Sequence, residues 1–329
     1  MQRGDCISLG IIGCGRIGRA HAQAALEDGR CRLVALADPV RPDRLGAEVG
    51  ARLVTSDYRE LLERSDIDAV VIATPTDTHL PIALDAVAAG KHMLVEKPVT
   101  LDAAGAEQLA QAARAAGVTV MVAQSRRFPP AVAELVRRLP RIGAIFRIHI
   151  HFLVSFPAPP TEWWKSARRA RGLVVPLQGS HSLDSILWWT GQTPRAVLAT
   201  GARRNQAWEG EDEADIICRL PDEGVATVHL SLSTAPAVHE ALVVGERGVL
   251  RLVESPVGKP FTWSFRPEEN GAGVFEDREC FPYLQQMQEF SSALLDGRTP
   301  LAGIDEVLPA MRTMDAAIAS MTRGVWVPV

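Results

Sequence analysis

Short hydrophobic runs alternate with amphipathic stretches along the first 125 residues of this chain. The runs have the length of buried strands and lie at 7–12, 32–37, 52–54, 69–73, 92–95 and 118–123. The stretches between them place apolar residues at helical spacing, most clearly at 58–64, 78–89 and 102–116. Strands that alternate with helices predict a parallel sheet covered on both faces, so residues 1–125 are expected to form a doubly wound α/β domain.

A different pattern begins after Phe128. A helical stretch at 130–139 leads into strands at 144–155, 195–202, 214–219, 225–234, 240–245, 249–254 and, more weakly, 261–265. Many short strands joined by turns predict an antiparallel sheet. We therefore expect a second, α+β domain over residues 126–329, with an open and mainly antiparallel sheet. Its last helix, at 304–323, could pack back on the first domain.

Two of these strands alternate polar and apolar residues. In 225–234 one side carries Ala226, Val228, Leu230 and Leu232, and the other carries Thr227, His229, Ser231 and Ser233. The polar side of 144–155 holds Arg147, His149 and His151. Two histidines two residues apart could hold a metal ion, but no third ligand is evident. A polar sheet face is the better account, and we predict no metal site.

Composition and charge limit the partners and the location. The 329 residues carry a formal net charge of −4, with a pI near 6.1. Without a basic surface, nucleic acid and anionic membrane are not expected partners, and a small-molecule ligand is. We expect no secretory segment, since no apolar run precedes the first predicted strand, and no run approaches the roughly 20 residues that span a bilayer. Five scattered cysteines without a CxxC pair suit a reducing cytoplasm.

A glycine-rich segment follows the first strand. The run 7–12 passes directly into Gly13-Cys14-Gly15-Arg16-Ile17-Gly18 and then into a helical stretch. In that context GxGxxG is the fingerprint of a dinucleotide-binding Rossmann fold: the first glycine permits the turn, the second admits a pyrophosphate and the third lets the helix pack on the strand. We predict that five residues contact the cofactor here: Gly13, Gly15, Arg16, Ile17 and Gly18.

The acid that ends the second strand bears on the choice of cofactor. Asp38 lies twenty residues beyond Gly18, where a Rossmann fold carries the carboxylate that binds the adenosine ribose. A carboxylate there repels a 2′-phosphate, so NAD is favoured. Arg41, three residues later, could accept that phosphate and leaves NADP possible.

Polar residues follow two further strands of the predicted parallel sheet. Thr74, Pro75 and Thr76 come after 69–73, and Glu96 and Lys97 come after 92–95. Ligands bind at the carboxyl edge of such a sheet, so we expect these residues beside the cofactor, with Lys97 as a proton donor or acceptor. The alternative for Glu96 and Lys97 is an exposed pair that ends a strand. His79, on the next helical turn, is either a ligand residue or bonded to nearby backbone.

The segments GCGRIG, ADP, ATPTDTH and VEKPVT, in this order and spacing, resemble the Gfo/Idh/MocA family of NAD(P)-dependent oxidoreductases. The likeness continues through QSRRFP at 124–129, where that family crosses into its second domain, and through the tail at 304–329. The resemblance implies that Lys97 is the catalytic lysine and that six residues lie along the cofactor: Gly13, Gly15, Gly18, Asp38, Thr74 and Glu96. It also implies a homo-oligomer, a dimer or tetramer formed through the open sheet face.

The helical stretch 178–191 resembles that family's second signature, Asp-x-Gly-x-His-x-x-Asp. Gly179, His181 and Asp184 match it, whereas Leu177 occupies the position of the first aspartate. The resemblance implies that His181 shares the proton transfer with Lys97. The missing carboxylate removes a group that would orient the imidazole and favour its charged form. His181 could instead be a packing residue of the helix.

Other residues are expected to meet the substrate. Stacked aromatic rings suit the apolar faces of sugars, so Trp163 and Trp164 are candidates, although a tryptophan pair that closes a core edge explains them equally well. Arg127, in the crossover segment, and Asp184 complete the predicted substrate set with Lys97 and His181.

These observations predict an NAD-dependent dehydrogenase or reductase that acts on a secondary alcohol or ketone of a sugar, sugar derivative or cyclitol. The predicted partner is therefore a polyol or sugar. Two alternatives stay open. One is a glycosidase that uses bound NAD for transient oxidation and elimination, as the resemblance also allows. The other is an NAD-binding protein without turnover, which the loss of an acid at Leu177 would favour.

Overall fold

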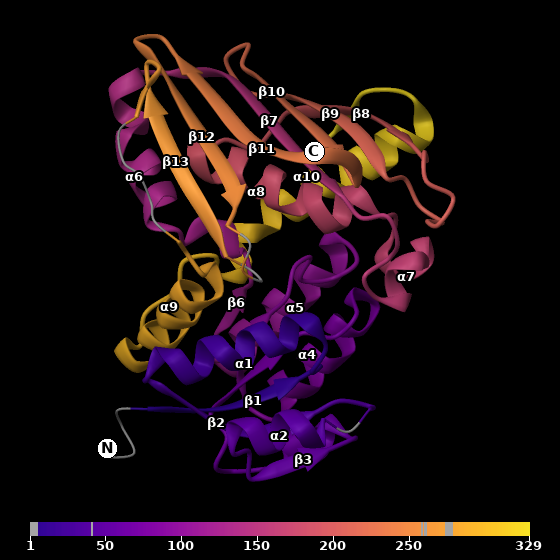
Figure 1. Ribbon diagram of the computed structural model, residues 1–329, viewed down its shortest axis with the longest axis vertical. Coiled ribbons are helices and arrows are strands. Elements are labelled where there is room, and N and C mark those ends of the chain that lie inside the picture. Colours follow the sequence, from indigo (N-terminus) through magenta and orange to yellow (C-terminus); the bar gives the residue numbers. More distant parts are fainter. Residues whose placement is uncertain (1–5, 41, 258, 260–261, 274–278) are drawn as a thin grey trace. The chain divides into compact units, whose positions relative to one another are not determined.

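The computed structural model describes residues 6–40, 42–257, 259, 262–273 and 279–329. The chain divides into two compact units, coloured along the sequence in Figure 1. The first contains Met1–Ser125 and Pro282–Leu308, and the second contains Arg126–Phe281 and Pro309–Val329. Residues 282–308, which sequence analysis assigned to the second domain, thus cluster with the first.

The first unit is built on a six-stranded parallel sheet. Its order is β3-β2-β1-β4-β5-β6, with bounds β1 Ile7–Ile12, β2 Cys31–Ala37, β3 Leu53–Thr55, β4 Ala69–Ile72, β5 His92–Val95 and β6 Val120–Val122. Every residue of β1 and β4 is buried, as expected where helices cover both faces. The predicted doubly wound α/β fold is confirmed.

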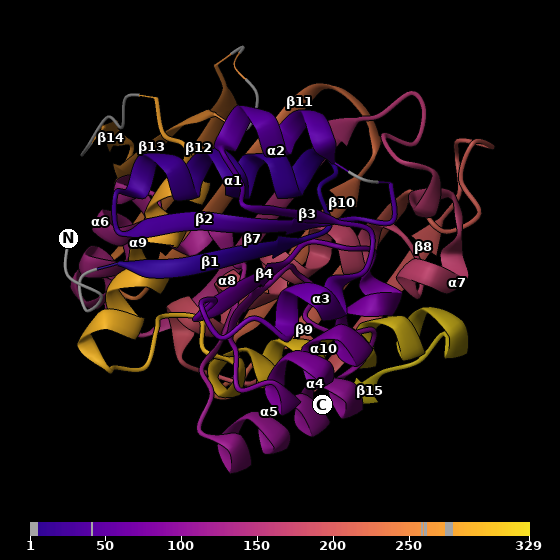
Figure 2. The ribbon, with the colours of Figure 1, turned by 90° about the horizontal axis from the view of Figure 1, so that it is seen from below.

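Helices flank this sheet on both sides. They are α1 Arg16–Asp28, α2 Asp43–Val49, α3 Tyr58–Leu62, α4 His79–Ala88, α5 Ala103–Ala116 and α9 Pro282–Asp296. Figure 2 shows α1 and α2 on one side of the strands and α3, α4 and α5 on the other. Helix α5 begins one residue later than predicted because Asp102 is its N-cap. The Asp102 carboxylate accepts from the Gly105 amide at 2.9 Å. Strand β6 begins late because the Val118 amide closes the end of α5 on Ala113.

The second unit is built on a nine-stranded mixed sheet. Its order is β14-β13-β12-β11-β7-β10-β9-β8-β15, and only the pair β7 and β10 is parallel among the described strands. The bounds are β7 Ile145–Ser155, β8 Ala196–Ala202, β9 Glu213–Arg219, β10 Val225–Ser231, β11 Ser233–Gly245, β12 Gly248–Pro256, β13 Trp263–Glu269, β14 Ala272–Gly273 and β15 Val327–Pro328. The predicted α+β domain with a mainly antiparallel sheet is confirmed.

Two strand predictions need correction. The predicted strand 225–234 is two strands, because the chain bends at Leu232, where the Ser233 amide bonds to the Ser231 hydroxyl at 3.0 Å. The predicted strand 240–245 is the later part of β11. Phe261, the first residue of the predicted strand 261–265, lies outside the described residues, and β13 continues to Glu269.

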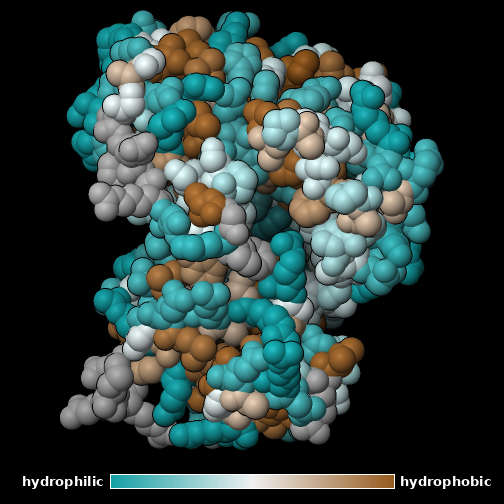
Figure 3. Space-filling model, in the orientation of Figure 1, coloured by the Kyte–Doolittle hydropathy of each residue, from teal (hydrophilic) through white to brown (hydrophobic). Residues whose placement is uncertain are grey.

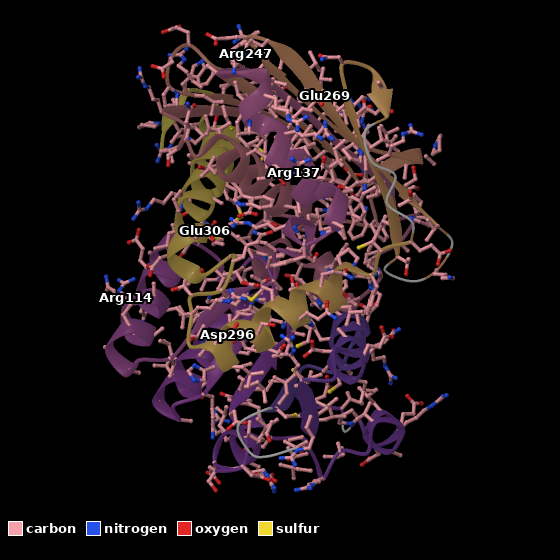
Figure 4. The ribbon with its side chains drawn as sticks, turned by 90° about the vertical axis from the view of Figure 1, so that its left-hand side faces the viewer. Arg114, Arg137, Arg247, Glu269, Asp296 and Glu306 are labelled. Atoms are coloured by element: carbon pink, nitrogen blue, oxygen red, sulfur yellow. The ribbon has the colours of Figure 1, made fainter. Side chains whose placement is uncertain are left out.

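Helices pack on one face of this second sheet. They are α6 Pro130–Arg138, α8 Ser180–Thr190 and the later part of α10 Ile304–Arg323, and a short helix, α7 Ala167–Ala170, precedes α8 (Figure 1). The partly buried Arg138 guanidinium donates to Glu269 at 2.6 Å. Figure 4 labels Glu269 and Arg137, the neighbour of Arg138 in α6. The alternation predicted for 144–155 and 225–234 is present, since Ile148, Ile150, Ala226 and Val228 are buried while His151 is exposed.

Candidate active site

The glycine-rich turn between β1 and α1 has the geometry of a phosphate loop. Gly13 has φ +91°, and a Cβ there would lie 2.6 Å from the Ala73 carbonyl oxygen. A Cβ on Gly18 would lie 1.9 Å from the Gly13 carbonyl oxygen. A Cβ on Gly15 would meet no described atom within 4 Å, so the protein itself does not demand that glycine. The geometry is what a pyrophosphate at the start of α1 requires, and Arg16 and Ile17 form the first turn there.

Asp38 lies at the end of β2 beside this turn. Its carboxylate accepts from the Cys14 amide at 2.7 Å and from the Val40 amide at 2.9 Å. A cavity of about 300 Å³ opens here, lined by Cys14, Gly15, Arg19, Asp38, Val40, Pro42, Asp43 and Arg44. A fixed carboxylate in an open polar cavity fits the hydroxyls of a ribose, so these residues fit NAD.

Arginines near Asp38 bear on whether this site could bind NADP as well as NAD. Arg41, the predicted competitor, lies outside the described residues. Arg19 and Arg44, which the sequence pattern did not indicate, line the same cavity. Both face Glu48, with nitrogen to oxygen distances of 3.8 and 2.9 Å, so part of their charge is already offset.

His79 joins the ends of β4 and β5. Its Nδ1 lies 2.9 Å from the Pro98 carbonyl oxygen, and its Nε2 lies 2.8 Å from the Thr74 carbonyl oxygen. The ring is buried, which lowers the pKa of His79. The Thr78 hydroxyl donates to Pro75 at 2.7 Å, and Thr76 is buried beneath the same turn. His79 is thus bonded to backbone, the second of its two predicted roles, and its contact with a cofactor stays a prediction.

Glu96 and Lys97 follow β5. The Glu96 carboxylate faces His21 of α1, with an Oε1 to Nε2 distance of 2.8 Å, and accepts from the Lys97 amide at 3.1 Å. Burial raises the pKa of Glu96, but the hydrogen bond with His21 and the charge of Lys97 lower it below its ordinary value. Glu96 is only 8% exposed, so the alternative of an exposed Glu96–Lys97 pair is wrong.

Helix α8 carries the histidine predicted for catalysis. A π-helical turn, Val175–Gly179, leads into it. Just before this turn, the half-buried Glu211 carboxylate accepts from the Leu173 amide at 2.9 Å. A Cβ on Gly179 would lie 3.0 Å from the Leu230 side chain, so this turn lies close to β10. Leu177 stands where the family signature has its first aspartate. It is 3% exposed, so this position is apolar and buried.

Two predicted substrate residues pair with each other beside His181. The Arg127 guanidinium donates to both Asp184 oxygens at 2.7 Å, and both side chains are 3% exposed. The Arg127 guanidinium also lies 5.1 Å from the ring centroid of Trp188. A buried bidentate pair fixes the crossover segment to α8. Direct contact of Arg127 or Asp184 with a substrate stays a prediction.

A second charged cluster lies beside His181, and the sequence did not predict it. Arg126 pairs with Glu254 of β12 and stacks on Phe152 of β7, 4.1 Å from its ring centroid. His239 of β11 lies opposite both Phe152 and Glu254 in the strand register. No local pattern marks these residues, because the sheet brings them together from strands far apart in sequence.

Trp163 and Trp164 belong to an aromatic cluster. They lie in a short 3₁₀ turn, Glu162–Lys165, with ring centroids 6.1 Å apart. Trp164 also contacts Phe156 at 5.7 Å and the buried Trp208 at 6.4 Å. The pair therefore closes a core edge, one of its two predicted roles, and sugar stacking stays a prediction.

The histidines of the sheet face have other partners. His149 Nδ1 lies 2.7 Å from the Thr227 hydroxyl, and His151 Nδ1 lies 3.8 Å from Glu240. Across the described part of the chain, no cluster of three or more histidine, cysteine, aspartate or glutamate side chains could hold a metal ion.

Comparison with known proteins gives matches in both units. Residues 7–124 match the model of an oxidoreductase family with an NAD-binding Rossmann fold, and residues 132–251 match the Gfo/Idh/MocA C-terminal domain. Inositol 2-dehydrogenase of Acidothermus cellulolyticus is 33% identical, over 96% of this chain and 92% of its own length. The scyllo-inositol 2-dehydrogenase (NAD(+)) of Bacillus subtilis is 28% identical, over 90% of this chain and 88% of its own.

Solved structures agree with these matches. The crystal structure of GenD2 from gentamicin A biosynthesis, in complex with NAD, superposes with a TM-score of 0.87. It is 25% identical and is matched over 99% of this chain and 97% of its own.

Proposed function

We infer the function from one premise: this chain belongs to the Gfo/Idh/MocA oxidoreductases, whose N-terminal domain is an NAD-binding Rossmann fold. We propose that it transfers a hydride between NAD(H) and a secondary alcohol or ketone of a sugar, sugar derivative or cyclitol. The inositol dehydrogenases among its relatives support this substrate class. NAD, when bound, supplies the hydride chemistry, and the protein supplies binding, orientation and proton transfer.

The first unit would hold NAD along the carboxyl edge of its sheet. The turn at Gly13–Gly18 would receive the pyrophosphate, Asp38 the ribose, and the turns after β4 and β5 the remaining length of the cofactor. Asp38 already accepts two backbone amides, so its position does not depend on the ligand. A fixed carboxylate favours the free 2′-hydroxyl of NAD over the phosphate of NADP.

The observation that carries the proposal is the anchoring of Lys97. Glu96, held by the buried His21 and by the Lys97 amide, fixes the backbone from which Lys97 extends at the ligand edge of the sheet. An ammonium so placed can hydrogen-bond the reacting oxygen and, when deprotonated, accept the alcohol proton. We assign this role to Lys97, with His181 as a second proton-transfer residue. Both must reach the same substrate oxygen, which is a requirement of the proposal.

The test is reduction of NAD by the purified protein across a panel of cyclitols and sugars, followed by the absorbance of NADH. A dehydrogenase gives stoichiometric NADH with at least one member of the panel. A glycosidase of the transient-oxidation type cleaves a glycoside without net NADH. Binding of NAD in calorimetry with neither outcome would leave a cofactor-binding protein and refute the proposal.

We further propose a homo-oligomer formed through the open face of the second sheet. Ile217 is 36% exposed there, beside Thr227 and His149 in the strand register, so the face mixes apolar and polar side chains. Figure 3 shows hydrophobic residues interspersed with hydrophilic ones over the second unit. Sedimentation that finds only monomer at micromolar concentration would refute this proposal.

A cytoplasmic location is proposed from the five cysteines, none of which forms a disulfide in the described part of the chain. None of the helices among the described residues is long and apolar enough to cross a bilayer. Fractionation of the native cell, followed by immunodetection, tests the location. Recovery outside the cytoplasm would contradict it.

A further inference from the structure

A small polar chamber lies between α8 and the inner face of the second sheet. The residues that line it include Arg126, His181, Ser182, Trp189, His239 and Glu254. Its volume, about 30 Å³, is enough for one or two water molecules by the rule that one needs roughly 10–15 Å³. All of these residues belong to the second unit, so the chamber is internal to it.

Three of the residues that line the chamber have a buried polar atom that needs a hydrogen-bond partner. Ser182 Oγ, Trp189 Nε1 and His239 Nε2 have no hydrogen-bond partner among the described residues. Their residues are 3%, 7% and 9% exposed. Buried polar groups are satisfied in folded proteins, and one hydroxyl, one donor and one imidazole nitrogen around a small space match the bonding capacity of a water molecule.

His239 connects this chamber to Glu254, whose side chain is 11% exposed. Its Nδ1 lies 3.5 Å from Glu254 Oε2 and 3.4 Å from Arg126 Nη2, while its Nε2 is the atom without a partner. Burial lowers the pKa of His239, so the ring is neutral near pH 7. The arrangement of a carboxylate, an imidazole and a free ring nitrogen is the one that orients a proton-transfer group in other enzymes.

We propose that a buried water in this chamber, held by Ser182, Trp189 and His239, links the Glu254–His239 pair to His181. This pair takes the place of the carboxylate that Leu177 removes, and sets the protonation and ring orientation of His181. Glu254 and His239 are positioning residues, since they act through His181. The inference rests on the proposed function for its consequence in catalysis, although the link itself can be measured without turnover.

The charges around the chamber predict a direction of change. The charged or titratable residues that line the chamber come from five segments. They are Arg126 of the crossover segment, His151 of β7, His181 of α8, His239 and Glu240 of β11, and Glu254 of β12. Glu240 pairs with Arg251 at 2.6 Å, whereas Glu254 forms an ion pair with Arg126 and so offsets its positive charge. Removing the charge of Glu254 would leave Arg126 uncompensated near His181. The charged form of His181 would then be less favourable.

The experiment is an NMR titration of the His181 ring in the full-length protein, assigned with His181→Gln. In Glu254→Gln the titration midpoint of His181 should move to lower pH by about one unit, the lower end of the range for a nearby charge. His239→Phe, which keeps every charge of the ion pair, should move the midpoint in the same direction by less. Glu268→Gln is the matched control: it changes a carboxylate on the neighbouring strand, outside the chamber, and should leave the midpoint unchanged.

A crystal structure of the wild type is expected to contain a water bonded to His239 Nε2, which tests the link even if Glu254→Gln fails to fold. Unchanged midpoints in the folded variants, or a chamber filled by side chains alone, would overturn the inference. A shifted midpoint in a protein that reduces no NAD with any polyol would uphold the link and refute the proposed function instead.

Discussion

The two regions that carry candidate catalytic residues are held in place by different means. At the sheet edge of the first unit, side chains bond to nearby main chain: Asp38 to Cys14, His79 to Thr74, and Glu96 to Lys97. Around α8, charged side chains from distant segments bond to each other, as Arg127 does to Asp184, 57 residues away. The first region is positioned mainly by turns and strand ends, with the buried Glu96–His21 pair as its exception, and the second mainly by buried ion pairs.

This difference predicts which property of the protein a substitution in each region changes. A side chain bonded to backbone can be lost with mainly local consequences, because the backbone group can turn to water or to another donor. One partner of a buried ion pair cannot be lost alone, since the remaining charge stays desolvated. Variants at the sheet edge should therefore affect binding or rate, whereas variants of the α8 pairs should affect stability.

The largest expected effect is on the chemical rate in Lys97→Ala. We expect the rate of hydride transfer to fall by about 10²–10⁴, the usual range for a positioned acid or base, with NAD affinity unchanged. Lys259→Ala, an exposed lysine of the second unit, is the control. Stopped-flow measurement of NADH formation checks the prediction. Normal turnover by Lys97→Ala would remove that lysine from the mechanism.

The next effect is on folding stability in Asp184→Asn. Removing the charge of Asp184 from its bidentate pair with the buried Arg127 should lower the free energy of unfolding by about 3–5 kcal/mol. Replacing both residues, in Arg127→Met with Asp184→Leu, should recover much of that loss because no buried charge remains. Urea denaturation of the three proteins measures it. If the single variant were as stable as wild type, buried ion pairs would not distinguish the two regions.

A smaller effect is expected on cofactor choice in Asp38→Ala. Loss of the carboxylate should weaken NAD binding and reduce the discrimination against NADP by about tenfold, or about 1.4 kcal/mol. Calorimetric titration with both cofactors gives the ratio for each protein. A wild type that binds NADP at least tenfold more tightly than NAD would mean that the nearby arginines outweigh the acid.

The same difference explains how much could be predicted from sequence. The turn at Gly13–Gly18 and the strand ends at Asp38 and Lys97 depend on a few neighbouring residues, so their pattern predicts their place. The partner of Glu96 could not be predicted, because His21 lies 75 residues away and reaches it only through the packing of α1 on the sheet. Sequence marks the gap at Leu177 but carries no local signal for Glu254.

Surface pairs illustrate the same limit. Arg114 of α5 pairs with Asp305, next to Glu306 at the start of α10, within the first unit (Figure 4). The two residues are 191 positions apart, and no periodicity connects them. Such exposed pairs contribute little to stability, so their absence from a sequence-based account matters less than that of the buried pairs.

The most direct test of the account is a comparison of single-turnover hydride transfer in Lys97→Ala, His181→Ala, the double variant and wild type, with the substrate found in the polyol panel. The account predicts a larger loss for Lys97→Ala than for His181→Ala, because a histidine without the carboxylate that Leu177 replaces spends part of its time in an unproductive tautomer or rotamer. It also predicts that the double variant is little worse than Lys97→Ala alone, as for residues that act as a unit. A loss in His181→Ala equal to or greater than that in Lys97→Ala would contradict the central role given to Lys97.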